Sequence, residues 1–150
     1  MKTLASPGAL PELERRIQAV APDDRAQWGR MNAPQMICHL RDALRLPLGQ
    51  LTVAPASLGI PRPLLKYLAL SVPMRWRKNI PTMPVFDQCR PGAPVPRFQE
   101  DVQELLSFNR QLLNDPVAGR LHPYFGPLTR EEWLRWAWLH ADHHLGQFGH

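Results

Sequence analysis

The sequence predicts an all-α fold, a four-helix bundle in which a long proline-rich crossover joins the second helix to the third. Three observations support this prediction. Four segments repeat apolar residues at the three- to four-residue spacing of an amphipathic helix. Ten of the 17 prolines lie between Pro47 and Pro96, and an interior proline interrupts a helix by removing a hydrogen-bond donor. Alternating β-branched residues, which are typical of strands, are few throughout the chain.

Two of the four helices are expected before the crossover. Residues 10–20 place three apolar side chains on one side of a helix. Residues 32–46 begin with a clear start signal, because Asn32 can cap the helix and Gln35 lies three residues later, in capping-box position. A first helix followed closely by a capped second helix is therefore predicted.

The other two helices are expected after the crossover, at residues 97–113 and 128–148. The second of these begins with Thr129 and Glu132, which form the S/T-x-x-E pattern of a capping box. Within the crossover itself, only short helical pieces such as residues 61–70 are expected.

Composition indicates one globular domain spanning residues 1–150. Hydrophobic residues make up 44% of the chain and charged residues 21%. Cys38 and Cys89 form no CxxC pair, which is typical of reduced thiols in a cytoplasm. No apolar window approaches the length of a membrane span, so a cytoplasmic protein with no membrane partner is expected.

The net charge of +5 permits contact with anionic partners. The charges are scattered, and only the run Arg75, Arg77 and Lys78, with Trp76 inside it, stands out. A solvated surface loop explains this short run better than a nucleic-acid site does.

The last predicted helix places histidines where apolar residues are expected. On a helical wheel that advances about 100° per residue from Trp133, His144 falls at about 20° and His140 at about 340°. Both histidines continue the apolar stripe, and their i, i+4 spacing lets two imidazoles converge on one ion. Ala141 follows His140, so the metalloprotease motif H-E-x-x-H and its general base are absent.

A third metal ligand has to come from another helix. His39 lies at the flank of the apolar stripe of residues 32–46, where it can face a neighbouring helix. Di-metal bundles need several carboxylates and E-x-x-H motifs, which this sequence does not contain. A mononuclear site of His39, His140 and His144 is therefore predicted. The alternative is that internal hydrogen bonds satisfy these imidazoles.

Several other residues are candidates for supporting roles. Gln147 and Asp42 could accept the second N–H of a ligating histidine, although a backbone-bonded amide and a surface carboxylate are the ordinary alternatives. His143 is expected at the edge of the apolar stripe, and His122 in a loop, either at the mouth of the site or packed in a corner. Trp138 points away from the stripe, so it is expected to be exposed and is a candidate homodimer contact.

Two segments resemble the DinB/YfiT-like superfamily of metalloenzymes, and within it a largely uncharacterised branch. They are WGRMNAPQMICHL, residues 28–40, and HPYFGPLTREEWLRWAWLHADHHLGQFG, residues 122–149. The resemblance implies a four-helix bundle that typically holds one divalent metal with three histidines. One histidine comes from the second helix and two come from an H-x-x-x-H in the last, which match His39, His140 and His144. Some relatives are thiol-dependent transferases or isomerases.

The sequence thus predicts an enzyme that depends on one divalent ion (zinc, nickel or iron), of hydrolase or thiol-transferase type. Its partner would be a small-molecule substrate, with a low-molecular-weight thiol as one candidate. An open zinc site lowers the pKa of water to about 7 and favours a thiolate over a thiol. The alternative is a non-catalytic helical binding module with hydrogen-bonded histidines. A weaker alternative is a nucleic-acid binder that uses the Arg75–Lys78 region.

Overall fold

A computed structural model describes residues 1–117 and 119–150. In these residues the protein is predominantly helical, with five α-helices, one short 3₁₀ helix (η1) and one small two-stranded sheet. The elements follow one another as α1 (Ala9–Ala19), α2 (Ala33–Leu44), α3 (Arg62–Leu70), η1 (Pro84–Phe86), α4 (Phe98–Asn114), β1 (Leu121–His122), β2 (Gly126–Pro127) and α5 (Arg130–Gln147).

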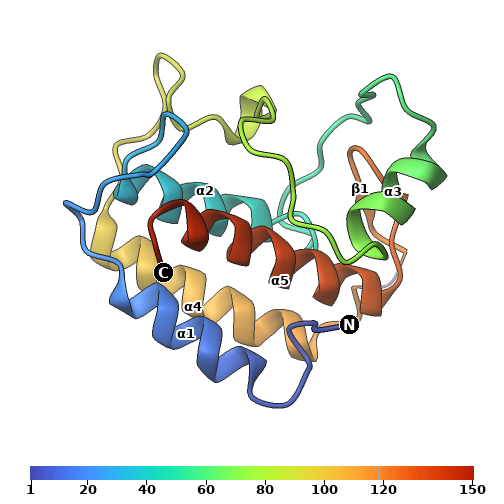
Figure 1. The fold of residues 1–150 in the computed structure, drawn as a ribbon, viewed down its shortest axis with the longest axis horizontal. Helices are drawn as coiled ribbons and strands as arrows, with labels where there is room; N and C mark the ends of the chain where they lie inside the picture. The colour runs from blue at the N-terminus through green and yellow to red at the C-terminus, as the bar shows by residue number, and fades with distance from the viewer. Residues whose placement is uncertain (118) are drawn as a thin grey trace.

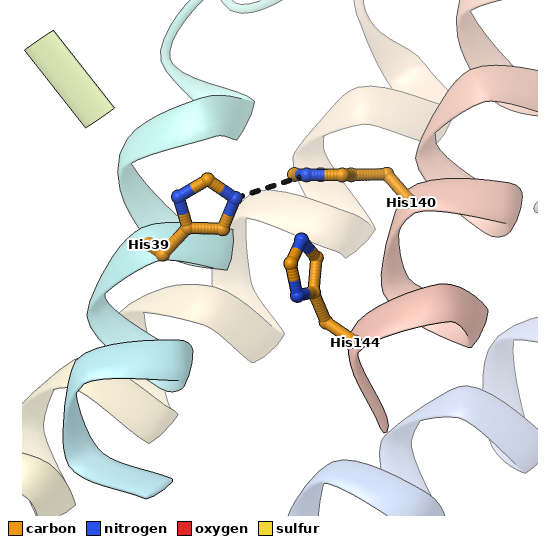
Figure 2. Close-up of side chains that lie close together, drawn as sticks. All are labelled: His39, His140 and His144. Carbon is orange, nitrogen blue, oxygen red and sulfur yellow. Dashed lines mark hydrogen bonds between the residues drawn. The ribbon is translucent and has the colours of Figure 1, made fainter. Parts of the chain in front are cut away.

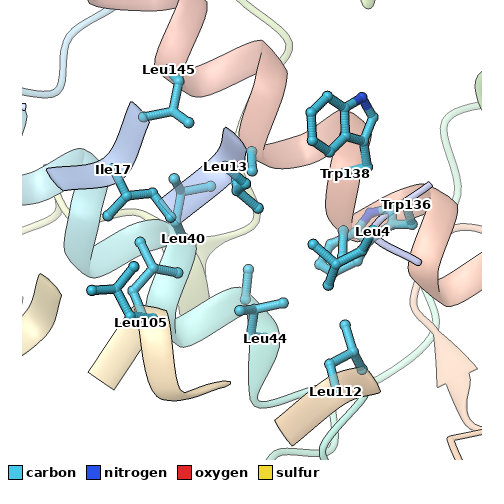
Figure 3. Close-up of a cluster of buried hydrophobic side chains, with 14 of the residues drawn as sticks. Leu4, Leu13, Ile17, Leu40, Leu44, Leu105, Leu112, Trp136, Trp138 and Leu145 are labelled. Carbon is cyan, nitrogen blue, oxygen red and sulfur yellow. The ribbon is translucent and has the colours of Figure 1, made fainter. Parts of the chain in front are cut away.

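Helices α1, α2, α4 and α5 correspond to the four predicted helices, so the predicted helical class is confirmed. They lie side by side (Figure 1), and α5 contacts α1, α2 and α4. Leucine and isoleucine side chains from all four fill the space between them (Figure 3). Leu13 of α1, Leu105 of α4 and Leu145 of α5 are at most 1% exposed. Burying apolar side chains of this size is the main favourable contribution to the stability of such a helix packing.

Both predicted capping boxes are present. The side chain of Asn32 accepts a hydrogen bond from the backbone N–H of Gln35, whose own side chain accepts from the N–H of Asn32. Thr129 and Glu132 make the same reciprocal pair at the start of α5. These bonds satisfy N–H groups that the first helical turn leaves without partners. They set where α2 and α5, the two helices that carry the predicted metal ligands, begin.

The crossover segment, residues 47–96, contains a regular helix as well as irregular chain. The short helical piece predicted at residues 61–70 is confirmed as α3, the fifth helix. Helix α3 packs on α5, and the side chain of Arg135 on α5 donates to the carbonyl of Leu70 at 3.2 Å. The 3₁₀ helix η1 contacts α2. The crossover segment therefore lies over α2 and α5 (Figure 1).

A small hairpin before α5 was not predicted. Leu121 and His122 of β1 pair antiparallel with Gly126 and Pro127 of β2. Two-residue strands are too short to show alternation in a sequence, which explains why the residues suggested only a loop. Gly126 has φ +75°, a conformation that side chains with a Cβ rarely adopt.

The expectation that Trp138 is exposed is wrong, because its side chain is only 5% exposed. The N-terminal segment covers it. The backbone N–H of Leu4 donates to the carbonyl of Leu134 at 3.0 Å, and the ammonium group of Lys2 lies 4.1 Å from the centroid of the Trp138 ring. A helical wheel considers one helix alone and cannot show such a neighbour. Trp138 is therefore covered within the chain and does not offer a surface for a homodimer contact.

Within the residues that the structure describes, no helix combines the length and the apolar character that crossing a bilayer requires.

Candidate metal centre

The three predicted histidines lie together where α2 faces α5. Each offers one ring nitrogen, and these atoms all lie within 4.8 Å of one another. The Nε2 atoms of His39 and His140 are 3.1 Å apart, although the two residues are 101 positions apart in the chain. Figure 2 shows the three rings turned toward a common point, with His39 on α2 and both other rings on α5.

The crossover segment orients His39. Its Nδ1 lies 3.0 Å from the backbone carbonyl oxygen of Phe86, the last residue of η1. A carbonyl oxygen only accepts hydrogen bonds, so Nδ1 carries the proton in this pair. In a neutral imidazole the other nitrogen is then unprotonated. The lone pair of His39 Nε2 consequently points into the group of three.

Gln147 orients His144 in a similar way. The Nδ1 atom of His144 lies 3.1 Å from Oε1 of Gln147, while Nε2 of Gln147 donates to the backbone carbonyl of Trp28. This second bond fixes which end of the amide is NH₂, because the Trp28 carbonyl cannot donate. Nδ1 of His144 is therefore the donor to Oε1. Its other ring nitrogen is left as an acceptor that faces the other two rings (Figure 2).

Gly29 makes room for this amide. It has φ +87°, and a Cβ atom at this position would overlap with the side-chain nitrogen of Gln147. The loop before α2 is also bonded to α5 through its backbone, since the N–H of Gln27 donates to the carbonyl of Gln147 at 2.8 Å. Residues 27–29 thus hold the far end of α5 against the start of α2.

The third imidazole, that of His140, is held by an aromatic neighbour. Trp136, one turn earlier on α5, stacks on it with ring centroids 4.9 Å apart and an angle of 18° between the planes. The ring of Trp76 from the crossover segment lies 6.2 Å away by the same measure. These indoles fix the plane of His140 and exclude water from one side of the group.

Burial keeps all three imidazoles in the neutral form. It lowers the pKa of His39 below its ordinary value, against the opposing effect of the Phe86 carbonyl. Burial lowers the pKa values of His140 and His144 well below the ordinary value, and the neighbouring imidazoles lower both further. Neutral imidazole with a free lone pair is the form of histidine that binds metals.

The C-terminal half of the chain matches a known family model. Residues 70–150 match the model described as "Protein of unknown function (DUF1569)". The chain belongs to this family. The DUF1569 match contains α4 and α5, with His140 and His144, whereas His39 lies before its first residue. No curated protein and no solved structure matches the chain.

The DUF1569 chain therefore presents a donor set that fits a divalent metal ion. Two lone pairs aimed at one point, with a third ring nitrogen beside them, are the arrangement that a cation satisfies. Imidazole suits zinc, nickel and iron, and three protein ligands leave room for a further ligand. Three neutral imidazoles could thus hold such an ion without cancelling its charge.

Of the other candidate residues, Asp42 does not hydrogen-bond to His39. Its Oδ2 accepts from the side chain of Gln88 at 3.0 Å and its Oδ1 from Arg41. The Phe86 carbonyl instead accepts the hydrogen bond from His39 that was predicted for Asp42. That interaction was invisible in the sequence, because any residue could supply a backbone carbonyl there.

His143 and His122 lie near the group without joining it. His143 sits beside the ring of Trp28, with centroids 4.7 Å apart, and 5.1 Å from the ring of His144. His122 belongs to β1, stacks on Phe125 at 4.3 Å, and accepts a hydrogen bond from the N–H of Tyr124 at Nδ1. Burial lowers the pKa of His122 to about 3. Of the two alternatives for His122, the packed corner is the one found.

Proposed function

We propose that this DUF1569 protein is a divalent-metal-dependent enzyme whose single ion is held by His39, His140 and His144. One observation carries the proposal. Residues on η1 and α5 fix the outer nitrogens of His39 and His144 as donors, so the inner nitrogens of both rings are acceptors, and His140 has at most one ring N–H to share between them. Such an arrangement is costly unless something positive occupies it.

The reaction class that suits this site is hydrolysis or thiol-dependent transfer. A bound divalent ion would act as a Lewis acid that lowers the pKa of a water or thiol. The chain's own groups would orient and enclose the site: the Phe86 carbonyl and Gln147 hold the ligand rings in place, and Trp136 packs against His140. The substrate would then be a small molecule, and zinc, nickel and iron are the candidate metals.

We extend the proposal to the fold of the whole chain, residues 1–150, as one four-helix domain of the DinB/YfiT-like type. The packing of α1, α2, α4 and α5 supports it. So does the pairing of one histidine on the second helix with two on the last. In this interpretation, α3 and η1 are additions carried by the crossover segment.

A non-catalytic helical module is the second candidate, and one distance favours it. The Nε2 atoms of His39 and His140 are 3.1 Å apart, which is also a hydrogen-bond distance. If His140 carries its proton on Nε2, it can donate to His39 without any metal. In this state the inner nitrogen of His144 has to share that donor or remain unpaired.

Metal analysis of protein purified without a histidine tag separates the two candidates. We expect about one divalent ion per chain in the parent protein. His140→Ala and His144→Ala should lose it. His122→Ala is the matched control, because His122 is buried to a similar extent as His144 and lies outside the group.

A metal content near zero in the parent protein, after growth and reconstitution with zinc, nickel and iron, would contradict the enzyme proposal. Equal metal loss in His122→Ala and His140→Ala would contradict the ligand assignment. It would show that any disturbance of the core removes the ion.

A further inference from the structure

The formal net charge of the protein resides in the crossover segment, residues 47–96. This segment contains six of the 18 basic residues and one of the 13 acidic residues, so its net charge is +5. The rest of the chain, with 12 basic and 12 acidic residues, is neutral. The one acidic residue, Asp87, already pairs with Arg30 from the loop before α2, at 3.4 Å. Lys66 pairs with Glu132 of α5 at 2.9 Å, so the crossover segment brings its excess of positive charge through its other basic residues.

Contacts of Trp76 hold this charged segment beside the three histidines. Its indole N–H donates to the carbonyl of Ala69, near the end of α3, at 2.9 Å. Its ring centroid lies 6.2 Å from that of His140 and 6.0 Å from that of His143. The Trp76 ring thus places this part of the crossover segment at the edge of the histidine group, although the segment contributes no ligand to it.

Lys78 is a basic residue of the crossover segment whose charge lies near the histidines. Its ammonium nitrogen lies 5.6 Å from the centroid of the Trp28 ring, which is 4.7 Å from the ring of His143. His143 in turn adjoins His144. Lys78 is exposed, and no carboxylate lies within salt-bridge distance of it among residues 1–117 and 119–150. Its positive charge faces solvent at the edge formed by Trp28 and His143.

We propose that the small molecule that binds beside the three histidines carries an anionic group, such as a carboxylate, and that Lys78 selects for it. This inference rests on the proposed metal site and names its substrate class. No acidic residue belongs to the group of three, and the nearby carboxylates of Asp42 and Asp142 already pair with Arg41 and Arg16. An anionic ligand would thus meet positive charge from both the ion and the crossover segment, which favours its binding and its rate of approach.

Cobalt(II)-loaded protein and two small thiols test this selection. Mercaptoacetate carries a carboxylate, whereas 2-mercaptoethanol is neutral and of similar size. Binding of either thiol to cobalt is followed by the sulfur-to-cobalt charge-transfer absorption, and the apparent Kd is measured for the parent protein, Lys78→Gln and Arg15→Gln. Arg15 is the matched control, because it is exposed on α1, away from the crossover segment (Figure 1), and its loss changes the net charge equally.

In Lys78→Gln we expect the Kd for mercaptoacetate to rise about two- to fivefold, the range for an exposed ion pair. The Kd for 2-mercaptoethanol should stay unchanged, as should both values in Arg15→Gln. Raising the salt concentration should weaken mercaptoacetate binding in the parent more than in Lys78→Gln, because exposed charges are screened.

Two results would overturn the proposal. Equal rises for both thiols in Lys78→Gln would make Lys78 a structural residue, and an unchanged Kd for mercaptoacetate would remove it from recognition. Failure of the proposed function looks different, because the parent protein would then bind no stoichiometric cobalt and show no charge-transfer band with either thiol. That result would remove the inference together with the metal site.

Discussion

Replacing Gln147 by methionine is the sharpest test of how the histidine group is held. Gln147 is 1% exposed, and its amide spans from His144 on one side to the Trp28 carbonyl on the other. Methionine keeps the length and approximate volume of the side chain but removes both polar atoms. The ring of His144 then loses the acceptor that fixes its tautomer and its plane.

The expected magnitude follows from the two lost bonds. Each buried group left without a partner costs about 1–3 kcal/mol, so the metal-free protein should lose roughly 2–6 kcal/mol of unfolding free energy. Loss of an outer partner of a ligating histidine typically lowers metal affinity about 10- to 100-fold, which corresponds to about 1.4–2.7 kcal/mol. The metal-loaded protein should therefore lose more stability than the metal-free protein.

Urea unfolding with and without metal, together with competition against a chelator of known affinity, measures both quantities. Gln88→Met is the matched control. Gln88 is a 5% exposed glutamine whose amide donates to Asp42 and hydrogen-bonds to no histidine. It should lose stability without losing metal affinity. The reasoning fails if Gln147→Met retains the parent affinity within about twofold, or if Gln88→Met loses as much affinity as Gln147→Met.

Three further predictions concern the same core. Gly29→Ala should lower metal affinity in the same direction as Gln147→Met, because the added Cβ displaces the amide, and chelator competition measures this. Removing the metal with a chelator should lower the unfolding free energy of the parent protein by about 2.7 kcal/mol, compared with protein in which free metal is present at 100 times Kd. The unfolding free energy of His140→Ala should not change in the same urea titration. The pKa of buried His122 is depressed to about 3, whereas its unfolded value is near 6.5. Neutral His122 therefore contributes its full stabilisation of the folded state above pH 6.5, and this stabilisation is lost as the pH falls toward 3. Between pH 8 and pH 5 this loss is about 2 kcal/mol, and His122→Phe should lose correspondingly less stability than the parent over that range in urea unfolding.

Much of the helical framework could be predicted because its signals are local. The capping boxes at Asn32 and Thr129 each depend on residues three positions apart, and both are present. The apolar spacing also placed His140 and His144 on one face of one helix, since that relation follows from helix geometry alone. The hairpin before α5 was missed, because strands of two residues leave no period to detect.

The support of the histidine group depends on contacts between distant segments. Asp42 was a reasonable partner for His39 by its spacing on the same helix, yet the Phe86 carbonyl, 47 residues away, takes that role. Gln147 was suggested by its place on α5, but its second bond, to Trp28, fixes the orientation of its amide. Neither backbone carbonyl has a sequence signature.

By itself, the sequence determined the helical class, the start of α2 and α5, and the shared face of two histidines, because each depends on residues within a few turns of one another. Only the tertiary structure decided that His39 lies within hydrogen-bond distance of His140, that Trp138 is covered, and that Lys78 lies at the edge of the site. The physical reason is that these relations join segments up to 136 residues apart, as between Lys2 and Trp138. Such contacts depend on how whole helices and the crossover pack, which no local pattern encodes.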